Sequence, residues 1–165
     1  MKTDYRTGRF GILDTDNIKD RTISKYAVGL DRRYKVKYYY DNSKRPGFTG
    51  YLIQYTLKGS GKFIKNGVCH EMTENTGFIA SLPGESIYYL PDDAEEPWVL
   101  LFLHFDCEML RPYMQRLDEL TGGIFSLPTS AKSIHSLLHF HERMANGERL
   151  QRYEGMEFLF GFICT

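Results

Sequence analysis

Short apolar and aromatic segments, separated by turn residues, fill the first two-thirds of the chain. From Tyr34 to Tyr40 basic residues alternate with apolar ones, which is the pattern of a strand with one face in water. The Asn66-Gly67 pair tolerates the positive φ angles of a two-residue hairpin turn. Many short strands at this spacing indicate a β-sandwich or barrel. Strands are expected at residues 26–30, 34–40, 51–57, 62–65, 68–72, 76–81, 86–90 and 98–105.

After residue 105 the turn residues become rare and the apolar period lengthens to that of helices. The apolar pattern of residues 109–120 predicts one helix. Ser130 is the expected cap of a second helix that runs to about Ala145, and a third helix is expected from near Glu148. The chain is therefore expected to be mainly β, with helices in its last third.

The two ends of the chain differ in character. Residues 1–25 carry mixed charge, with a single apolar stretch at residues 10–13, so an arm or a first edge strand is expected. The stretch from Phe158 to Cys164 is apolar on every side and has no polar cap. Because an all-apolar helix end needs a partner or a continuation, the chain is expected to be cut from a longer protein.

Composition narrows the class of protein. With 165 residues, of which 42% are hydrophobic and 25% charged, the sequence is typical of one soluble globular domain. The 21 basic residues equal the 21 acidic residues, so DNA binding by this chain alone is disfavoured. Its three cysteines form no CxxC pair, which favours a reducing cytoplasm. No apolar run approaches the ~20 residues of a membrane span.

The sequence holds no clear catalytic motif. The Gly59-Ser60-Gly61-Lys62 stretch lacks the flanking residues of a phosphate-binding loop, so a hairpin corner is the favoured interpretation. His135 and His139 are one helical turn apart with Glu142 on the same face, but a solvated helix face explains them better than a metal site. His104 lies in an aromatic strand, where a core imidazole is favoured over a catalytic one.

Three stretches share their order and spacing with a known family. They are RPGFTGYLIQYTLKGSG at residues 45–61, GFIASLPGESIYY at residues 77–89 and WVLLFLHF at residues 98–105. Together they resemble the N-terminal ligand-sensing domain of AraC-type transcription regulators. The resemblance implies a double-stranded β-helix (cupin or jelly-roll) barrel, followed by an α-helical dimerisation region.

The resemblance also implies how the chain is divided. Residues 1–25 would be the N-terminal arm, residues 26–106 the effector-binding barrel and residues 107–165 the helical dimerisation region. Members of this family continue into a paired helix-turn-helix domain that reads the major groove. Nothing in this sequence resembles that domain, so promoter DNA would be contacted only through residues that the chain does not contain.

A binding site inside the barrel follows from the same resemblance. The family's sugar-binding example has Arg, Tyr, His and Trp at the positions that align with Arg45, Tyr89, Leu100 and Phe102. The implied ligand is a small-molecule effector, namely a sugar or sugar derivative, although the Leu in place of a His argues against arabinose itself. The competing interpretation makes Arg45 an exposed loop cation and Tyr89 a core ring.

The alternation within one strand extends this candidate site. Positions 98, 100, 102 and 104 share a strand face, so Trp98 and His104 are expected to join Arg45, Tyr89 and Phe102 at the barrel mouth. An aromatic wall with a few polar anchors suits a sugar, whose C–H faces stack on rings.

Metal chemistry is not expected in this barrel. Metal-binding cupins take His and Glu ligands from two strand motifs, whereas Phe63, Ile64 and Ile87 stand at the corresponding positions here. We therefore expect no cofactor and no enzymatic activity. The alternative is a cupin enzyme with an atypical metal site at His70, His104 or the helical histidines.

The terminal helices carry the expected contact between subunits. Apolar residues recur there at intervals of three or four, and the stripe is wider than one side of a small barrel could cover. The resemblance implies an antiparallel homodimer about a two-fold axis. A third interpretation, besides the effector sensor and the cupin enzyme, is a sensor that has lost its ligand and only dimerises. The predicted interface residues are Leu150, Tyr153, Leu159, Phe160 and Ile163.

Overall fold

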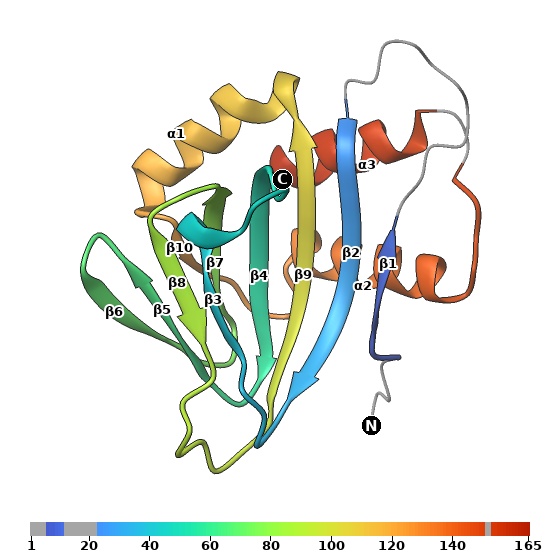
Figure 1. Cartoon of the computed structure of the whole chain (residues 1–165). Coiled ribbons are helices and arrows are strands. Elements are labelled where there is room, and N and C mark those ends of the chain that lie inside the picture. The colour runs from blue at the N-terminus through green and yellow to red at the C-terminus, as the bar shows by residue number, and fades with distance from the viewer. Residues whose placement is uncertain (1–5, 12–22, 151–152) are drawn as a thin grey trace.

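Two antiparallel β-sheets form the body of the molecule, as the computed structural model shows (Figure 1). The structure describes residues 6–11, 23–150 and 153–165. The larger sheet has six strands, in the spatial order β1 (Gly8–Gly11), β2 (Ile23–Arg33), β9 (Trp98–Cys107), β4 (Gly50–Lys58), β7 (Thr76–Leu82) and β10 (Ile124–Ser126). The smaller sheet has four, in the order β3 (Tyr39–Asp41), β8 (Ser86–Tyr89), β5 (Gly61–Lys65) and β6 (Val68–Met72).

The helices pack on the face of the larger sheet that points away from the smaller one. They are α1 (Arg111–Thr121), α2 (Lys132–Ala145) and α3 (Glu154–Ile163), with short 3₁₀ turns at Asn42–Lys44 and Glu108–Leu110. None of these helices is long and apolar enough to cross a membrane. The prediction of a mainly β fold with helices in the last third is confirmed.

Strand β9 shows how the alternation of side chains builds two separate cores. Leu101, Leu103 and Phe105 point to the helices and join a core with side chains of α1, α2 and α3. Trp98 and Leu100 point the other way and join a core shared by the two sheets. Successive residues of a strand face opposite sides, so a strand buried on both faces reads as one continuous apolar run.

The corner between β4 and β5 is shaped by Trp98. A Cβ atom on Gly61 would lie 2.3 Å from ring carbons of Trp98, so only glycine leaves room for this fully buried indole. Gly59 has a φ of +72°, which favours glycine at the turn itself. The indole Nε1 donates a hydrogen bond to Thr56 Oγ1 at 3.0 Å. The Gly-Ser-Gly stretch is therefore a hairpin corner between β4 and β5, as the sequence indicates.

Some boundaries differ from the expected ones. The strand expected at residues 34–40 is short, because Lys35 adopts a φ of +52° and the extended backbone resumes only at Tyr39. The expected turn at Asn66-Gly67 is confirmed, with φ angles of +52° and +77° between the paired residues Lys65 and Val68.

The helical third also departs from expectation in detail. The second helix begins at Lys132 and receives no side-chain cap, so Ser130 does not cap it. The third begins at Glu154 rather than near residue 148. Strand β10, which follows the Gly122-Gly123 break, was not expected from the pattern because its three residues are too few to show a period. Of the alternatives for residues 1–25, an edge strand is found at β1, and residues 12–22 lie outside the described part of the chain.

Candidate functional site

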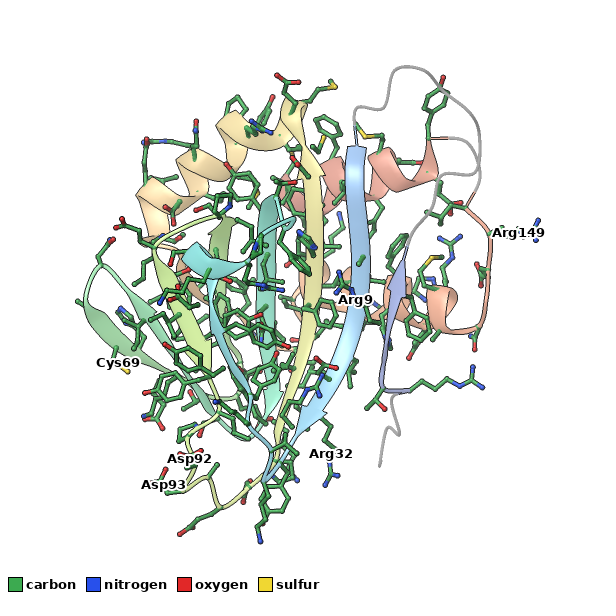
Figure 2. The ribbon with its side chains drawn as sticks, in the orientation of Figure 1. Arg9, Arg32, Cys69, Asp92, Asp93 and Arg149 are labelled. Atoms are coloured by element: carbon green, nitrogen blue, oxygen red, sulfur yellow. The ribbon has the colours of Figure 1, made fainter. Side chains whose placement is uncertain are left out.

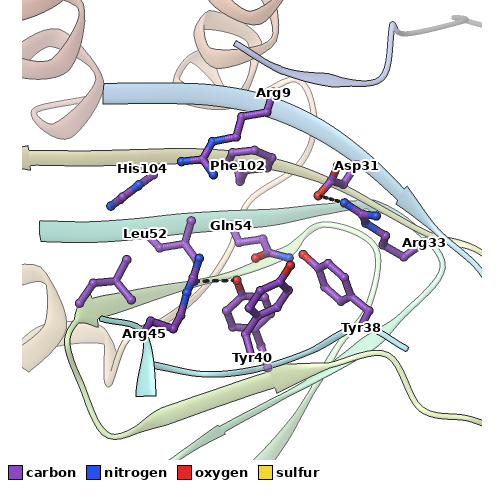
Figure 3. A pocket seen from close by; sticks show the side chains of 12 residues that line it. Arg9, Asp31, Arg33, Tyr38, Tyr40, Arg45, Leu52, Gln54, Phe102 and His104 are labelled. Carbon is purple, nitrogen blue, oxygen red and sulfur yellow. Dashed lines mark hydrogen bonds and ion pairs between the residues drawn. The ribbon is translucent and has the colours of Figure 1, made fainter. Parts of the chain in front are cut away.

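A cavity of about 150 Å³ lies between the inner faces of the two sheets (Figure 3). An engineered protein cavity of about this volume holds one benzene molecule, so the space accommodates one small ring. The lining residues are Arg9, Asp31, Arg33, Tyr38, Tyr40, Arg45, Leu52, Gln54, Leu82, Tyr88, Phe102 and His104.

One wall of the cavity is a row of residues that runs straight across the larger sheet. Arg9 of β1 pairs with Gly29 of β2, Gly29 with Phe102 of β9, and Phe102 with Gln54 of β4. A Cβ atom on Gly29 would lie 2.3 Å from Cζ of Phe102 and 2.6 Å from the carbonyl oxygen of Gly8. The missing side chain therefore lets the Phe102 ring lie beside β1, where Arg9 reaches the same space.

Tyrosines form the opposite wall. Tyr40 of β3 and Tyr88 of β8 are directly paired, and their rings stack at 5.1 Å between centroids. Tyr38 packs edge-on against Tyr40 at 5.1 Å and against Trp98 at 6.0 Å. Such ring contacts hold the wall rigid, and each tyrosine still carries a polar hydroxyl.

Arg45 lies at the edge of this wall, just after the 3₁₀ turn at Asn42–Lys44. Its Nη1 donates to the Tyr88 hydroxyl at 3.0 Å and to Asn42 Oδ1 at 3.3 Å. The guanidinium carbon lies 4.8 Å from the Tyr40 ring centroid and 4.3 Å from that of Phe48. Neutral partners thus hold the group in place, and no carboxylate in the described part of the chain forms an ion pair with it.

The hydroxyls of Tyr38 and Tyr88 stay neutral at physiological pH. Burial raises the pKa of Tyr88 to about 12, and the guanidinium of Arg45 opposes part of that rise. Burial also raises the pKa of Tyr38. Both hydroxyls therefore keep their protons and can donate to a ligand as well as accept from it.

At the other end of the cavity, Arg33 donates through Nη2 to Asp31 Oδ2 at 2.9 Å.

His104 is buried, and its Nε2 lies 2.9 Å from the carbonyl oxygen of Thr49. A carbonyl oxygen only accepts hydrogen bonds, so Nε2 carries the proton. The imidazole also stacks on Phe48, at 5.7 Å between ring centroids.

The structure brings three of the six predicted ligand-site residues together. Arg45, Phe102 and His104 line the cavity. Trp98 and Leu100 share their strand face, as expected, but are sealed in the core between the sheets and do not line the space.

Tyr89 is a correction to the predicted site. It points to the outer face of β8, where its ring lies 6.0 Å from that of Tyr39. Its neighbour Tyr88 takes the inward position because successive strand residues alternate. The alignment to the family motif selected Tyr89, one residue after the tyrosine that faces inward. The alternation of residues that follow the Pro83-Gly84 turn does not reveal this one-residue error.

Several lining residues were missed by sequence reasoning. Arg9, Asp31 and Gln54 come from strands far apart in the chain and meet only through strand pairing. Tyr38 and Tyr40 belong to a tyrosine-rich segment that reads as an alternating solvated strand. A chain position alone carries no signal for pairings of this kind.

The histidines and cysteines outside the cavity form no recognisable centre. His135 and His139 are exposed on α2, and within the described ranges no three His, Cys, Asp or Glu residues are placed to hold a metal ion. Cys69 and Cys164 are exposed, Cys107 is buried, and all three are free thiols.

The predicted interface residues are spread over different environments. Leu159 is fully buried in the core between helices and sheet, which corrects its assignment to a surface between subunits. Tyr153 is 57% exposed, whereas Leu150, Phe160 and Ile163 are half-buried. The apolar stripe of α3 therefore divides between the domain's own core and its surface.

Comparison with known proteins gives one family match. Residues 29–163 match the model of the AraC-like ligand binding domain. No curated protein matches the chain significantly.

Solved structures share the fold at low sequence identity. The AraC-like transcriptional activator CuxR is 9% identical and has a TM-score of 0.57, over 84% of this chain and 49% of that one. The apo K231A variant of ToxT from Vibrio cholerae is 12% identical with a TM-score of 0.50, over 83% of this chain and 52% of that one. The chain thus spans about half the length of these two proteins.

Proposed function

Because this chain belongs to the AraC-like ligand binding domain family, we propose that it senses a small-molecule effector in the cavity between its two sheets. The observation that carries the proposal is the cavity itself, which combines a rigid aromatic wall with several polar side chains at its edges. Ligand sites are typically concave, mostly apolar and supplied with a few directed polar groups.

The proposed ligand is a sugar or sugar derivative of about one ring. The tyrosine wall offers flat faces for the C–H surface of a sugar, and Arg45, Gln54 and the tyrosine hydroxyls offer partners for its oxygens. The cavity volume of about 150 Å³ limits the buried part of the ligand to one small ring.

In this proposal the chain is the sensing half of a transcription regulator. The balance of 21 basic and 21 acidic residues provides no positive field for DNA. We assign DNA contact to the other half of such a regulator, since the chain spans about half the length of the AraC-like activator that shares its fold.

We also propose that two chains pair through the helical layer. Within α3 the described apolar side chains are half-buried, apart from the fully buried Leu159. A helix that is apolar on nearly every side and lies at the molecular surface is stabilised by a second covering surface. A second copy of the chain, related by a two-fold axis, would supply it.

The sensing function is tested by a melting-temperature screen of sugars, sugar acids and glycosides. A ligand at 100 times its Kd adds about 2.7 kcal/mol to the free energy of unfolding, which is a readily measured shift. Binding would also change the emission of Trp98, the single tryptophan, because Tyr38 lines the cavity and packs against it.

Two neighbouring tyrosines of β3 provide the matched control. Tyr40 lines the cavity, while Tyr39 is 51% exposed and does not line it. Tyr40→Ala should weaken binding of a screening hit about tenfold, since ring stacking contributes about 0.5–1.5 kcal/mol beyond the buried area. Tyr39→Ala should leave the affinity unchanged. Equal effects of the two substitutions, or a complete screen without a hit, would contradict the proposal.

A further inference from the structure

The charges around the cavity do not balance. Three arginines and one aspartate line it. Arg33 pairs with that aspartate, Asp31, whereas among the described residues no carboxylate lies within ion-pair distance of Arg9 or Arg45. The cavity therefore keeps two positive charges that no carboxylate of residues 6–11, 23–150 and 153–165 neutralises.

These two charges lie against the same aromatic ring. The guanidinium carbon of Arg45 is 4.3 Å from the centroid of Phe48, and that of Arg9 is 5.8 Å from it; Figure 3 shows the two arginines reaching into the cavity from opposite edges. Like charges held near each other beside a low-dielectric surface repel, and an anion between them would relieve that repulsion.

The hydrogen-bonding groups of the cavity that lack a partner also favour an anionic ligand. In the described part of the chain, Nε of Arg33 and Nε2 of Gln54 are buried without a hydrogen-bond partner. Both atoms are donors, and both residues line the cavity. Leaving such a buried donor without a partner costs about 1–3 kcal/mol, so an acceptor on a bound ligand that reached these atoms would be favoured.

The cavity offers few acceptors in return. Asp31 is the carboxylate among the lining residues, and it already accepts from Arg33. The side-chain oxygen of Asn42 accepts from Arg45, and the Tyr88 hydroxyl does the same. Each of these acceptors already receives one hydrogen bond from the protein, whereas a ligand rich in acceptors would meet buried donors that have no partner among the described residues.

Arg45 is oriented in advance for an anionic group. Its Nη1 is held by Asn42 and Tyr88, and its plane is held by two rings, while Nη2 and Nε have no partner among the described residues. A planar guanidinium with two free donors matches the two oxygens of a carboxylate. Holding the group in its bound geometry lowers the entropic cost of binding.

Resting on the effector-sensing function proposed above, we infer that the effector is a small organic acid, whose carboxylate is bound between Arg45 and Arg9 and whose ring lies against the tyrosine wall. Within the sugar derivatives, this selects sugar acids over neutral sugars and glycosides. The same chemistry admits small aromatic acids, because the opposite walls are the rings of Tyr40 and Phe102.

The test uses two series of probes that vary charge at constant ring size. One series is glucuronate, glucose and glucosamine, and the other is benzoate, benzamide and benzylamine. Titration calorimetry on the wild-type chain should show the acid of a series binding at least tenfold more tightly than its neutral member. The amine should bind most weakly of the three.

Substitutions then locate the charge dependence. Arg45→Gln should weaken binding of the acid tenfold or more, and should weaken binding of the neutral probe by a clearly smaller factor, because the neutral probe loses a hydrogen bond but no charge pairing. Arg9→Gln should give a smaller loss of the same kind, and its exposed side chain makes unfolding of that variant unexpected. Arg32→Gln is the matched control, because Arg32 is exposed on β2 (Figure 2) and does not line the cavity, and this substitution removes the same charge.

The outcomes distinguish this inference from the proposed sensing function on which it rests. Neutral probes that bind as tightly as their acids, or acids that bind Arg45→Gln and Arg9→Gln as tightly as wild type, would overturn the inference and leave the sensing cavity standing. If neither acid binds the wild-type chain at millimolar concentration, the inference is overturned, whereas the sensing function is overturned only if the melting-temperature screen also gives no hit. Equal losses in Arg32→Gln and Arg45→Gln would reduce the effect to net charge and overturn the inference.

Discussion

Tyr88 links the rigid wall of the cavity to its principal cation. Its hydroxyl accepts a 3.0 Å hydrogen bond from Arg45, and its ring is buried between Tyr40 and Phe78. A residue with both contacts controls where the guanidinium lies. Its role is therefore to position Arg45 and to offer one hydroxyl to the ligand.

Removing that hydroxyl should weaken ligand binding without unfolding the chain. For Tyr88→Phe we expect a five- to tenfold loss of affinity, since one hydrogen bond contributes about 1 kcal/mol net. Tyr89→Phe removes the same atom from the outer face of β8 and should leave affinity unchanged. Titration calorimetry on the two variants checks this, and a larger loss in Tyr89→Phe would contradict the orientation of β8.

His141 gives the fold a defined pH dependence. The imidazole is fully buried on α2, neither ring nitrogen has a hydrogen-bond partner among the described residues, and Phe10 of β1 packs edge-on at 5.4 Å. Burial lowers its pKa from the ordinary value of 6.5, and Glu142 opposes part of that shift. The folded chain therefore excludes a proton that the unfolded chain accepts.

Stability should consequently fall as the pH drops below about 6.5. A group whose pKa is lowered by folding contributes fully above its unfolded pKa and loses that contribution towards acid, at no more than about 1.4 kcal/mol per pH unit. Urea denaturation at pH 7.5 and 5.5 measures the loss. His141→Leu should show a smaller loss than wild type, whereas the exposed His135→Leu should match wild type. An unchanged loss in His141→Leu would refute this source of the pH dependence.

At the scale of elements, α3 presents two kinds of apolar residue. Leu159 is fully buried against the sheet and the other helices, so it stabilises the fold of its own chain. Leu159→Ala should lower the free energy of unfolding by about 2–5 kcal/mol, the usual cost of truncating a buried leucine. Thermal unfolding measures this, and a loss below 0.5 kcal/mol would show that the side chain is not buried in solution.

Phe160, one residue further, tests the proposed dimer. Its ring is half-buried, so Phe160→Asp should leave the β-rich circular dichroism intact and shift a dimer to monomer. Sedimentation at micromolar concentration measures the assembly, with Glu157→Asp on the exposed side of the same helix as the control. A wild-type chain that is monomeric throughout that range would exclude the interface.

The sequence predicts elements better than it predicts their contacts, and β9 and β8 show why. In β9 the residues are apolar on both faces, and both faces are buried: Trp98 packs in the core between the sheets and Leu101 in the core under the helices. In β8 two adjacent tyrosines have the same chemistry, so the pattern does not say which one faces inward. A slip of one residue moves a side chain to the other face of the sheet.

At the scale of the whole molecule, the cavity depends on strand pairings between distant parts of the chain. Arg9 reaches it only because β1 pairs with β2, and Gln54 because β4 pairs with β9. Arg45, by contrast, was predicted because it belongs to a local motif shared with the family. The double-sheet fold, the helical third and part of the site were thus predictable, whereas the charged rim of the cavity required the three-dimensional pairing.

The central claim is that one small molecule binds between the two sheets. The most direct test is a crystal structure of the chain with the tightest-binding compound from the melting-temperature screen. The account predicts one molecule per chain in the cavity, in contact with Arg45, Gln54 and Phe102. A compound bound elsewhere, such as on the helical layer, with the space between the sheets left unchanged, would contradict it.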